Sequence, residues 1–130
     1  MQSFSVLLVG ENKWLLKALR ALVESDPMFM VTGTCSLQDV LAKSEQLLPD
    51  MLVFLPEVSF MSCQEVLSTL RSEYFQPCLL LITPVDAALY ESIIPSADAY
   101  QFISQSQINT DLLPRIRQYV SECQDTEHES

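Results

Sequence analysis

Few side chains in this 130-residue chain could carry out covalent or metal chemistry, and they lie far apart in the sequence. The only histidine is His128, near the C-terminus. The four cysteines form no C-x-x-C pair and stand at Cys35, Cys63, Cys78 and Cys123. A zinc site draws closely spaced cysteine and histidine ligands together, and a serine hydrolase needs a histidine beside its nucleophile. The pattern predicts no metal site and no Ser-His-Asp site, and it favours reduced, mostly buried cysteines that pack as small hydrophobic residues.

The turn after the first apolar run, residues 10–13, reads Gly-Glu-Asn-Lys. It matches neither the G-x-G-x-x-G fingerprint nor a P-loop, the two glycine-rich turns that hold nucleotide phosphates against a helix N-terminus. This argues against nucleotide binding, and we expect no cofactor.

The charge of the chain limits its partners. Seven basic and seventeen acidic residues give a formal net charge of −10, which disfavours nucleic-acid phosphates and anionic membrane surfaces. With 48% hydrophobic residues the chain can bury a core of its own. It shows neither a signal-peptide pattern nor an apolar run of roughly 18 residues. We therefore expect a cytoplasmic domain whose partners are proteins.

Short apolar runs alternate with longer stretches of helical spacing along the chain. The runs predict strands at 5–9, 29–33, 51–55, 78–83 and 99–103. The helical stretches predict helices at 13–24, 37–47, 62–73, 87–94 and 110–122. Asn12 is the expected N-cap of the first helix. One domain is expected at 1–123, followed by a disordered acidic tail at 124–130.

This alternation predicts a doubly wound α/β fold, a three-layer flavodoxin-like sandwich around a parallel sheet of strand order 2-1-3-4-5. Parallel neighbours need crossover connections, and these are right-handed. Ligands of such folds bind beyond the carboxyl ends of the strands, at the switch point between strands one and three. A functional site is therefore expected around residues 10–12, 55–59, 83–84 and 103–104.

Several short motifs stand in order along the predicted elements. They are Val-Leu-Leu-Val at 6–9, Pro-Asp-Met-Leu-Val at 49–53, Glu-Val-Leu at 65–67 with Leu-Arg at 70–71, and Ala-Asp-Ala-Tyr at 97–100. Together they resemble the receiver (CheY-like) domain of response regulators, especially the NarL/FixJ type, over residues 5–120. The resemblance implies a domain that accepts a phosphoryl group on an aspartate at the end of strand three, with help from magnesium.

The residues that this chemistry needs are largely replaced. The family has two acids after strand one, where this chain has Gly10 and Glu11. Its phosphoacceptor aspartate falls at Leu55, and the lysine that closes its site falls at Ile103. Because an aliphatic side chain offers neither a nucleophilic oxygen nor a metal ligand, the resemblance implies a pseudo-receiver that cannot be phosphorylated.

Other positions of the resembled site keep polar or aromatic side chains. Thr83 matches the family's switch hydroxyl and Tyr100 its coupled aromatic, although both residue types also suit ordinary strand packing. Glu57 could face Glu11 near the former metal site. Two solvated carboxylates are the simpler interpretation of that pair, and we expect no bound metal.

Candidate interface residues are Trp14, Tyr100, Arg115 and Arg117. Trp14 is either an exposed anchor for a partner or, more simply, a lid that packs over Gly10. The two arginines either contact an acidic partner or, more simply, lie on a solvated helix face.

The sequence thus favours a non-enzymatic signalling module that binds protein partners or a second copy of itself. One alternative is the N-terminal regulatory domain of a LuxR/NarL-type transcription regulator whose DNA-binding part is not in this chain. Another, of a different class, is a small flavodoxin-like cofactor protein or enzyme.

Overall fold

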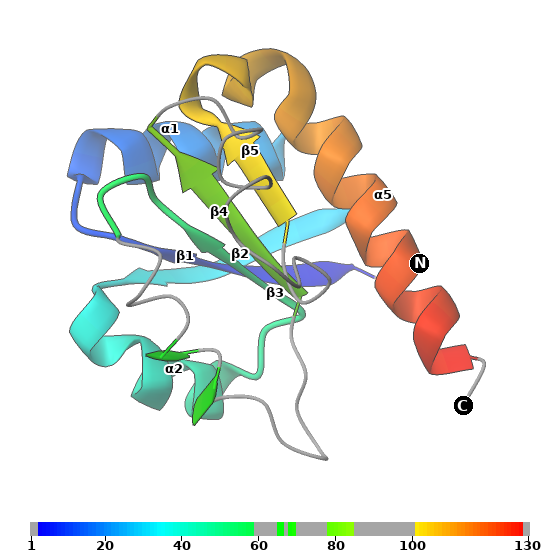
Figure 1. Ribbon diagram of the computed structural model, residues 1–130, viewed down its shortest axis with the longest axis horizontal. Helices are drawn as coiled ribbons and strands as arrows, with labels where there is room; N and C mark the ends of the chain where they lie inside the picture. The colour runs from blue at the N-terminus through cyan, green and yellow to red at the C-terminus, as the bar shows by residue number, and fades with distance from the viewer. Residues whose placement is uncertain (1–2, 59–64, 67, 70–77, 85–100, 129–130) are drawn as a thin grey trace.

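The computed structural model describes residues 3–58, 65–66, 68–69, 78–84 and 101–128 (Figure 1). Its elements are β1 (Phe4–Val9), α1 (Lys13–Glu24), β2 (Phe29–Cys35), η1 (Leu37–Asp39), α2 (Val40–Leu47), β3 (Met51–Phe54), β4 (Cys78–Thr83), β5 (Gln101–Ser104), η3 (Gln105–Gln107) and α5 (Ile108–His128). The expected helices at 62–73 and 87–94 lie outside the described residues, except for helical positions 65–66 and 68–69.

The five strands form one parallel sheet in the order β2-β1-β3-β4-β5, which confirms the predicted fold. Every residue of β3 and β4 is buried. Strands of this kind are apolar throughout because helices cover both faces of the sheet.

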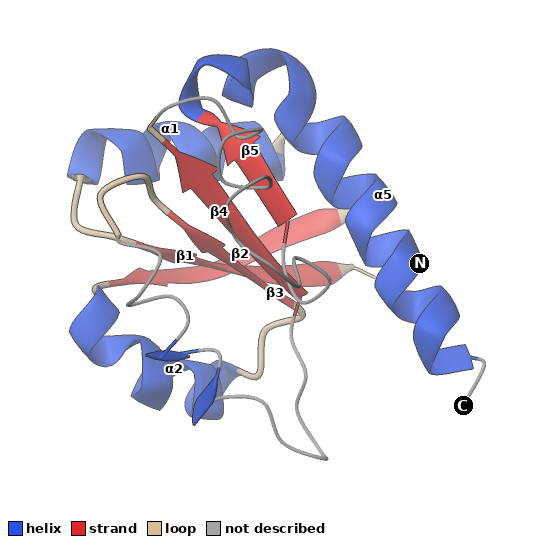
Figure 2. Cartoon of the chain, in the orientation of Figure 1, coloured by secondary structure: helices blue, strands red, loops and turns tan. Residues whose placement is uncertain are grey.

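Two hydrophobic clusters fill the space between the sheet and the helices that cover its two faces. Figure 2 shows these helices and the sheet as separate layers. On one face, α1 and α5 pack against alternate strand residues, with Leu19, Val23, Leu112 and Ile116 buried among them. On the other face, α2 contributes Val40. The site at the carboxyl ends of the strands therefore rests on a core that is packed from both sides. Among the described helices, none is both long and apolar enough to cross a lipid bilayer.

Helix α5 ends later than expected. The sequence predicts a helix end near 122, whereas α5 continues to His128. The division into a domain at 1–123 and a tail at 124–130 stays a prediction. No glycine or proline follows Pro114, so nothing in the backbone chemistry of this stretch stops the helix. Pro114 lies inside α5, in its second turn.

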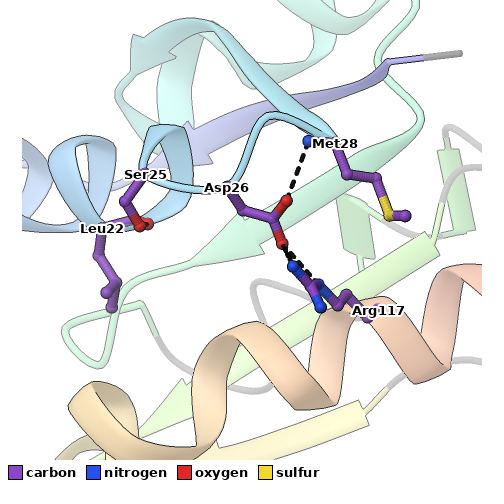
Figure 3. A network of polar contacts seen from close by, with 5 residues as sticks. All are labelled: Leu22, Ser25, Asp26, Met28 and Arg117. Atoms are coloured by element: carbon purple, nitrogen blue, oxygen red, sulfur yellow. Dashed lines mark hydrogen bonds and ion pairs between the residues drawn. The ribbon is translucent and has the colours of Figure 1, made fainter. Parts of the chain in front are cut away.

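A buried carboxylate joins the end of α1 to α5 (Figure 3). Asp26 Oδ1 accepts a hydrogen bond of 3.0 Å from the Met28 amide, and Asp26 Oδ2 pairs with the Arg117 guanidinium. The Met28 bond is the largest influence on the pKa of Asp26, and with the Arg117 pair it outweighs the opposing effect of burial, so this pKa lies below its ordinary value. Arg117 therefore serves the fold.

The sequence favours reduced cysteines, and the structure contradicts this expectation for one of them. Cys78, at the start of β4, is bonded in a disulfide, whereas the buried Cys35 is a free thiol. Sequence spacing could not indicate this bond, because a disulfide depends on which cysteines the fold brings together. Burial, with a smaller contribution from Asp39, raises the pKa of the Cys35 thiol to about 11.

Helix α2 contains two unfavourable local features. Its C-cap, Leu48, adopts a left-handed conformation with φ 47° just before Pro49. Within the helix, the Ser44 hydroxyl is fully buried and has no hydrogen-bond partner among the described residues. Both features leave room for stabilising substitutions.

Candidate functional site

The candidate site lies where β1 and β3 end side by side at the switch point of the sheet. Gly10 follows β1, and Leu55 follows β3. The Leu55 amide donates 2.9 Å to the Val9 carbonyl, and the Gly10 amide donates 2.9 Å to the Cys35 carbonyl. Figure 1 shows the arrowheads of β1, β3 and β4 on the side where α1 begins. The predicted site residues from these strands therefore do come together.

Leu55 and Ile103 belong to the hydrophobic core. Both side chains are 0% exposed, and both lie in the cluster that α1 and α5 cover. None of residues 51–55 carries a carboxylate, so the end of β3 presents only aliphatic, aromatic and thioether side chains. The centre of the site is thus buried and packed, and the side chains of β3 include no nucleophile.

Gly10 is required by a close approach of Leu55. A Cβ atom at position 10 would lie 2.7 Å from both Cβ and Cδ2 of Leu55, and 3.0 Å from the Glu57 Oε1 atom. These distances are shorter than van der Waals contact. The backbone of Gly10 has no positive φ, so glycine is needed for space and not for its conformational freedom. Leu55 and Glu57 together fill the volume that a side chain at position 10 would occupy.

Glu57 binds the two backbone amides that immediately precede α1. Its Oε1 atom accepts hydrogen bonds of 3.0 Å from the Glu11 amide and 2.8 Å from the Asn12 amide. Asn12 is the N-cap of α1, as predicted, and its Oδ1 atom accepts 3.2 Å from the Leu15 amide. A carboxylate is stabilised at a helix N-terminus because the unpaired amides and the helix dipole both favour negative charge.

A metal would have to compete for this carboxylate. Glu57 is directed to backbone amides, and the Glu11 side chain is exposed. Within the part of the chain that the structure describes, no group of three or more histidine, cysteine or acidic residues is placed to hold a metal ion.

Thr83 ends β4 in a buried position. Its hydroxyl donates a long hydrogen bond of 3.4 Å to the Ile103 carbonyl on the neighbouring strand. Thr83 pairs in register with Ser104, which is also buried. Tyr100, the expected partner of Thr83 in a switch, lies outside the described residues, so their coupling stays a prediction.

Neither a family model nor a curated protein matches the chain. Several solved structures, in contrast, match it over most of its length. A CheY-like response regulator receiver domain protein from Methanospirillum hungatei JF-1 matches with a TM-score of 0.74 at 18% identity, over 96% of this chain and 99% of that chain. The receiver domain of NarL from Mycobacterium tuberculosis matches with a TM-score of 0.74 at 15% identity, over 93% and 98%. The chain has the receiver-domain fold.

A third receiver domain, from an HD domain-containing protein of Pseudomonas fluorescens Pf-5, matches with a TM-score of 0.73 at 19% identity. It covers 93% of this chain and 97% of that chain. The receiver fold therefore extends over nearly all of the 130 residues, as the sequence motifs implied.

The predicted interface residues have different surroundings in this receiver fold. Trp14 is 84% exposed, so the simpler expectation of a lid packed over Gly10 is wrong. Arg115 Nη1 donates 3.4 Å to the Phe102 carbonyl, and Arg117 pairs with Asp26. The two arginines contribute to the fold, whereas Trp14 is a large apolar side chain that is exposed to solvent.

The sequence did not indicate that Glu57 would bind the start of α1. Glu57 lies 46 positions after Glu11 and 45 positions after Asn12, and no local motif links these residues. A carboxylate that serves a helix N-terminus is recognisable in sequence only when it lies within the helix's first turn, and α1 has no acidic residue there.

Proposed function

We propose that this chain is a pseudo-receiver, a signalling module with the receiver fold that acts by binding other proteins without control by phosphorylation. The observation that carries the proposal is the packing of Leu55 against Gly10 at the end of β3. The receiver folds of the solved structures support the signalling role.

Phosphoryl transfer to a protein carboxylate needs a nucleophilic oxygen and cations that neutralise the charge developing on the phosphoryl oxygens. Leu55 supplies no oxygen, and Ile103 supplies no charge at the end of β5. Glu57 occupies the amides of Glu11 and Asn12 that could otherwise bind an anion. The site therefore lacks the nucleophile, the lysine and a free anion-binding turn.

The same substitutions favour a single conformational state. Clustered carboxylates repel one another unless a metal is bound, so the conformation of an acidic pocket depends on whether a cation occupies it. Here the corresponding volume is filled by buried aliphatic side chains. Such a domain acts as a fixed docking surface, and we expect it to have no enzymatic activity.

The test is incubation with acetyl phosphate and magnesium, followed by intact-mass measurement and sedimentation analysis. We expect neither a phosphoryl adduct nor a change in oligomeric state. Labelling of any aspartate together with a changed oligomeric state would overturn the proposal. The triple variant Gly10→Asp/Leu55→Asp/Ile103→Lys restores the missing groups, and labelling of this variant alone would identify these three positions as the cause.

The likeness to LuxR-family regulators favours a second candidate function. Matching structures include a LuxR-family two-component response regulator from Aurantimonas sp. SI85-9A1 and the RcsB response regulator of Salmonella typhimurium, of which this chain covers 59%. In this role the domain would regulate a DNA-binding part carried by another segment or chain. A DNA-binding assay of the chain alone should then be negative, as its charge of −10 also implies.

A flavodoxin-like cofactor protein or enzyme is the alternative of another class. A bound chromophore or nucleotide would appear in the absorbance spectrum and the native mass of the purified protein. Either finding would favour that role over the pseudo-receiver.

A further inference from the structure

The outward face of α1 combines an exposed tryptophan with basic side chains. Trp14 is 84% exposed, and Lys13, Lys17 and Arg20 are exposed around it. These three residues are nearly half of the seven basic residues in a chain whose net charge is −10. Tryptophan and arginine are enriched among the residues that anchor protein interfaces.

The tryptophan heads an apolar strip along the helix. Trp14, Ala18 and Ala21 follow the spacing i, i+4, i+7, and all three are exposed. Residues with this spacing lie on one face of a helix. Leu19 and Val23 hold the opposite face against the sheet. The strip is therefore rigidly supported, and its two alanines let the backbone of another helix approach closely.

The charges beside the strip are mostly positive. Arg20 Nε donates 3.1 Å to Glu24 Oε1 on the same helix. Lys13 and Lys17 form no ion pair with any described residue, and they flank Trp14 in sequence. A partner that covers Trp14 must therefore approach two lysines, which favours carboxylates at the edges of its own apolar face.

The same charges discriminate between possible occupants. A second copy docked symmetrically through α1 would bring the Lys13 and Lys17 side chains of both copies together, and like charges in an interface oppose association. A nucleic acid would be repelled by the chain as a whole, whose net charge is −10. An acidic helix of a different protein meets neither obstacle.

We propose that the α1 face formed by Lys13, Trp14, Lys17, Ala18 and Ala21 docks an acidic amphipathic helix of a partner protein. The inference rests on the proposed function, that the domain acts by binding proteins. It specifies where the partner binds and what chemistry it presents. An amphipathic helix docks through apolar anchor residues at helical spacing. Charged residues around these anchors determine which partner is preferred.

Trp14 is the only tryptophan of the chain, so its fluorescence reports on this face alone. The probe is a synthetic helical peptide with a leucine and alanine strip bordered by glutamates, and its control carries lysines in place of the glutamates. We expect the acidic peptide to shift the Trp14 emission to shorter wavelength and to bind about tenfold or more tightly than the lysine peptide. This preference should weaken with added salt.

Two charge variants provide a matched comparison. Lys17→Glu should weaken binding of the acidic peptide several-fold, whereas Lys43→Glu changes the net charge equally at an exposed position of α2 and should leave it unchanged. Trp14→Ala, followed by calorimetry, should abolish most of the binding because it removes the anchor.

Three results would overturn the inference. These are equal binding of the two peptides, equal effects of Lys17→Glu and Lys43→Glu, or a concentration-dependent dimer that Trp14→Ala dissociates. Acetyl phosphate labelling of the same preparation keeps the two proposals apart. Failure of peptide binding without labelling refutes only the α1 surface, whereas labelling with a changed oligomeric state refutes the proposed function.

Discussion

At the scale of single residues, the site is defined by side chains that fill space. Leu55 and Ile103 are completely buried, and Gly10 is the residue that lets Leu55 fit. Functional sites usually contain exposed polar groups of perturbed pKa. Here the positions where such groups would be expected are part of the core, so their substitutions should be measured first as changes in stability.

The contact between Gly10 and Leu55 makes Gly10→Ala destabilising. The added methyl group would lie 2.7 Å from Leu55 Cβ, and overpacking of this kind lowers the free energy of unfolding by about 1–3 kcal/mol. Urea denaturation measures the change. Gly33→Ala is the matched control, because its Cβ would meet its nearest side chain at an ordinary distance of 3.6 Å. Equal effects of the two substitutions would contradict the explanation.

Cys35 should resist thiol reagents in the folded protein. Burial, with a smaller effect of Asp39, raises its pKa to about 11, so the reactive thiolate is scarce at pH 8. Alkylation with iodoacetamide, followed by peptide mass mapping, should leave Cys35 unmodified in the native state and modify it fully in urea. Rapid native labelling would show that β2 opens locally.

At the scale of elements, much of the fold could be predicted from the sequence. The strand at 78–83 was predicted with its observed bounds, and the strand at 51–55 within one residue, because continuous apolar runs bounded by proline or polar residues have few other interpretations. The end of α5 was missed because its last turns are polar and carry no packing signal. The apolar character of positions 55 and 103 was also apparent from the sequence.

The polar details of the site could not be predicted in the same way. The Glu57 bonds to the start of α1 join two loops that are distant in sequence, and only the strand order brings them together. The exposure of Trp14 depends on how α1 is rotated on the sheet. Such features follow from tertiary geometry, whereas strand and helix positions follow from local periodicity.

The end of α2 offers a stabilising substitution. Leu48 has φ 47° and is 61% exposed. The left-handed conformation disfavours residues that have a Cβ, so Leu48→Gly should raise the free energy of unfolding by about 1 kcal/mol. Thermal or urea denaturation checks this. Leu48→Ala removes the exposed side chain but keeps the Cβ, and it should give no such gain.

Helix α2 also contains a buried hydroxyl, that of Ser44, with no hydrogen-bond partner in the described part of the chain. Ser44→Ala removes an unsatisfied polar atom and improves helix propensity. We expect a gain of about 1 kcal/mol in the free energy of unfolding, measured by urea denaturation. A loss of stability would mean that the hydroxyl has a partner that the described residues do not reveal.

At the scale of the whole molecule, the Asp26 and Arg117 pair joins the turn between α1 and β2 to the last helix, α5. Its contribution should depend on pH. The folded-state pKa of Asp26 is depressed below the ordinary value of 3.8. The stabilisation is therefore fully present at neutral pH and is lost as the pH falls through the folded-state pKa.

A double-mutant cycle with Asp26→Asn and Arg117→Gln tests this dependence. The coupling between the two positions, measured by urea denaturation, should be present at pH 7 and should shrink steadily below about pH 4. Coupling that persists unchanged in acid would show that the carboxylate charge is not what joins the two segments.

The contact between Gly10 and Leu55 also makes the two positions interdependent. An acid introduced at position 10 alone would collide with Leu55. An aspartate introduced at position 55 alone would bury a charge in a hydrophobic cluster. Each single substitution should therefore lose stability before it adds any chemistry, and the effects of the two substitutions should not be additive.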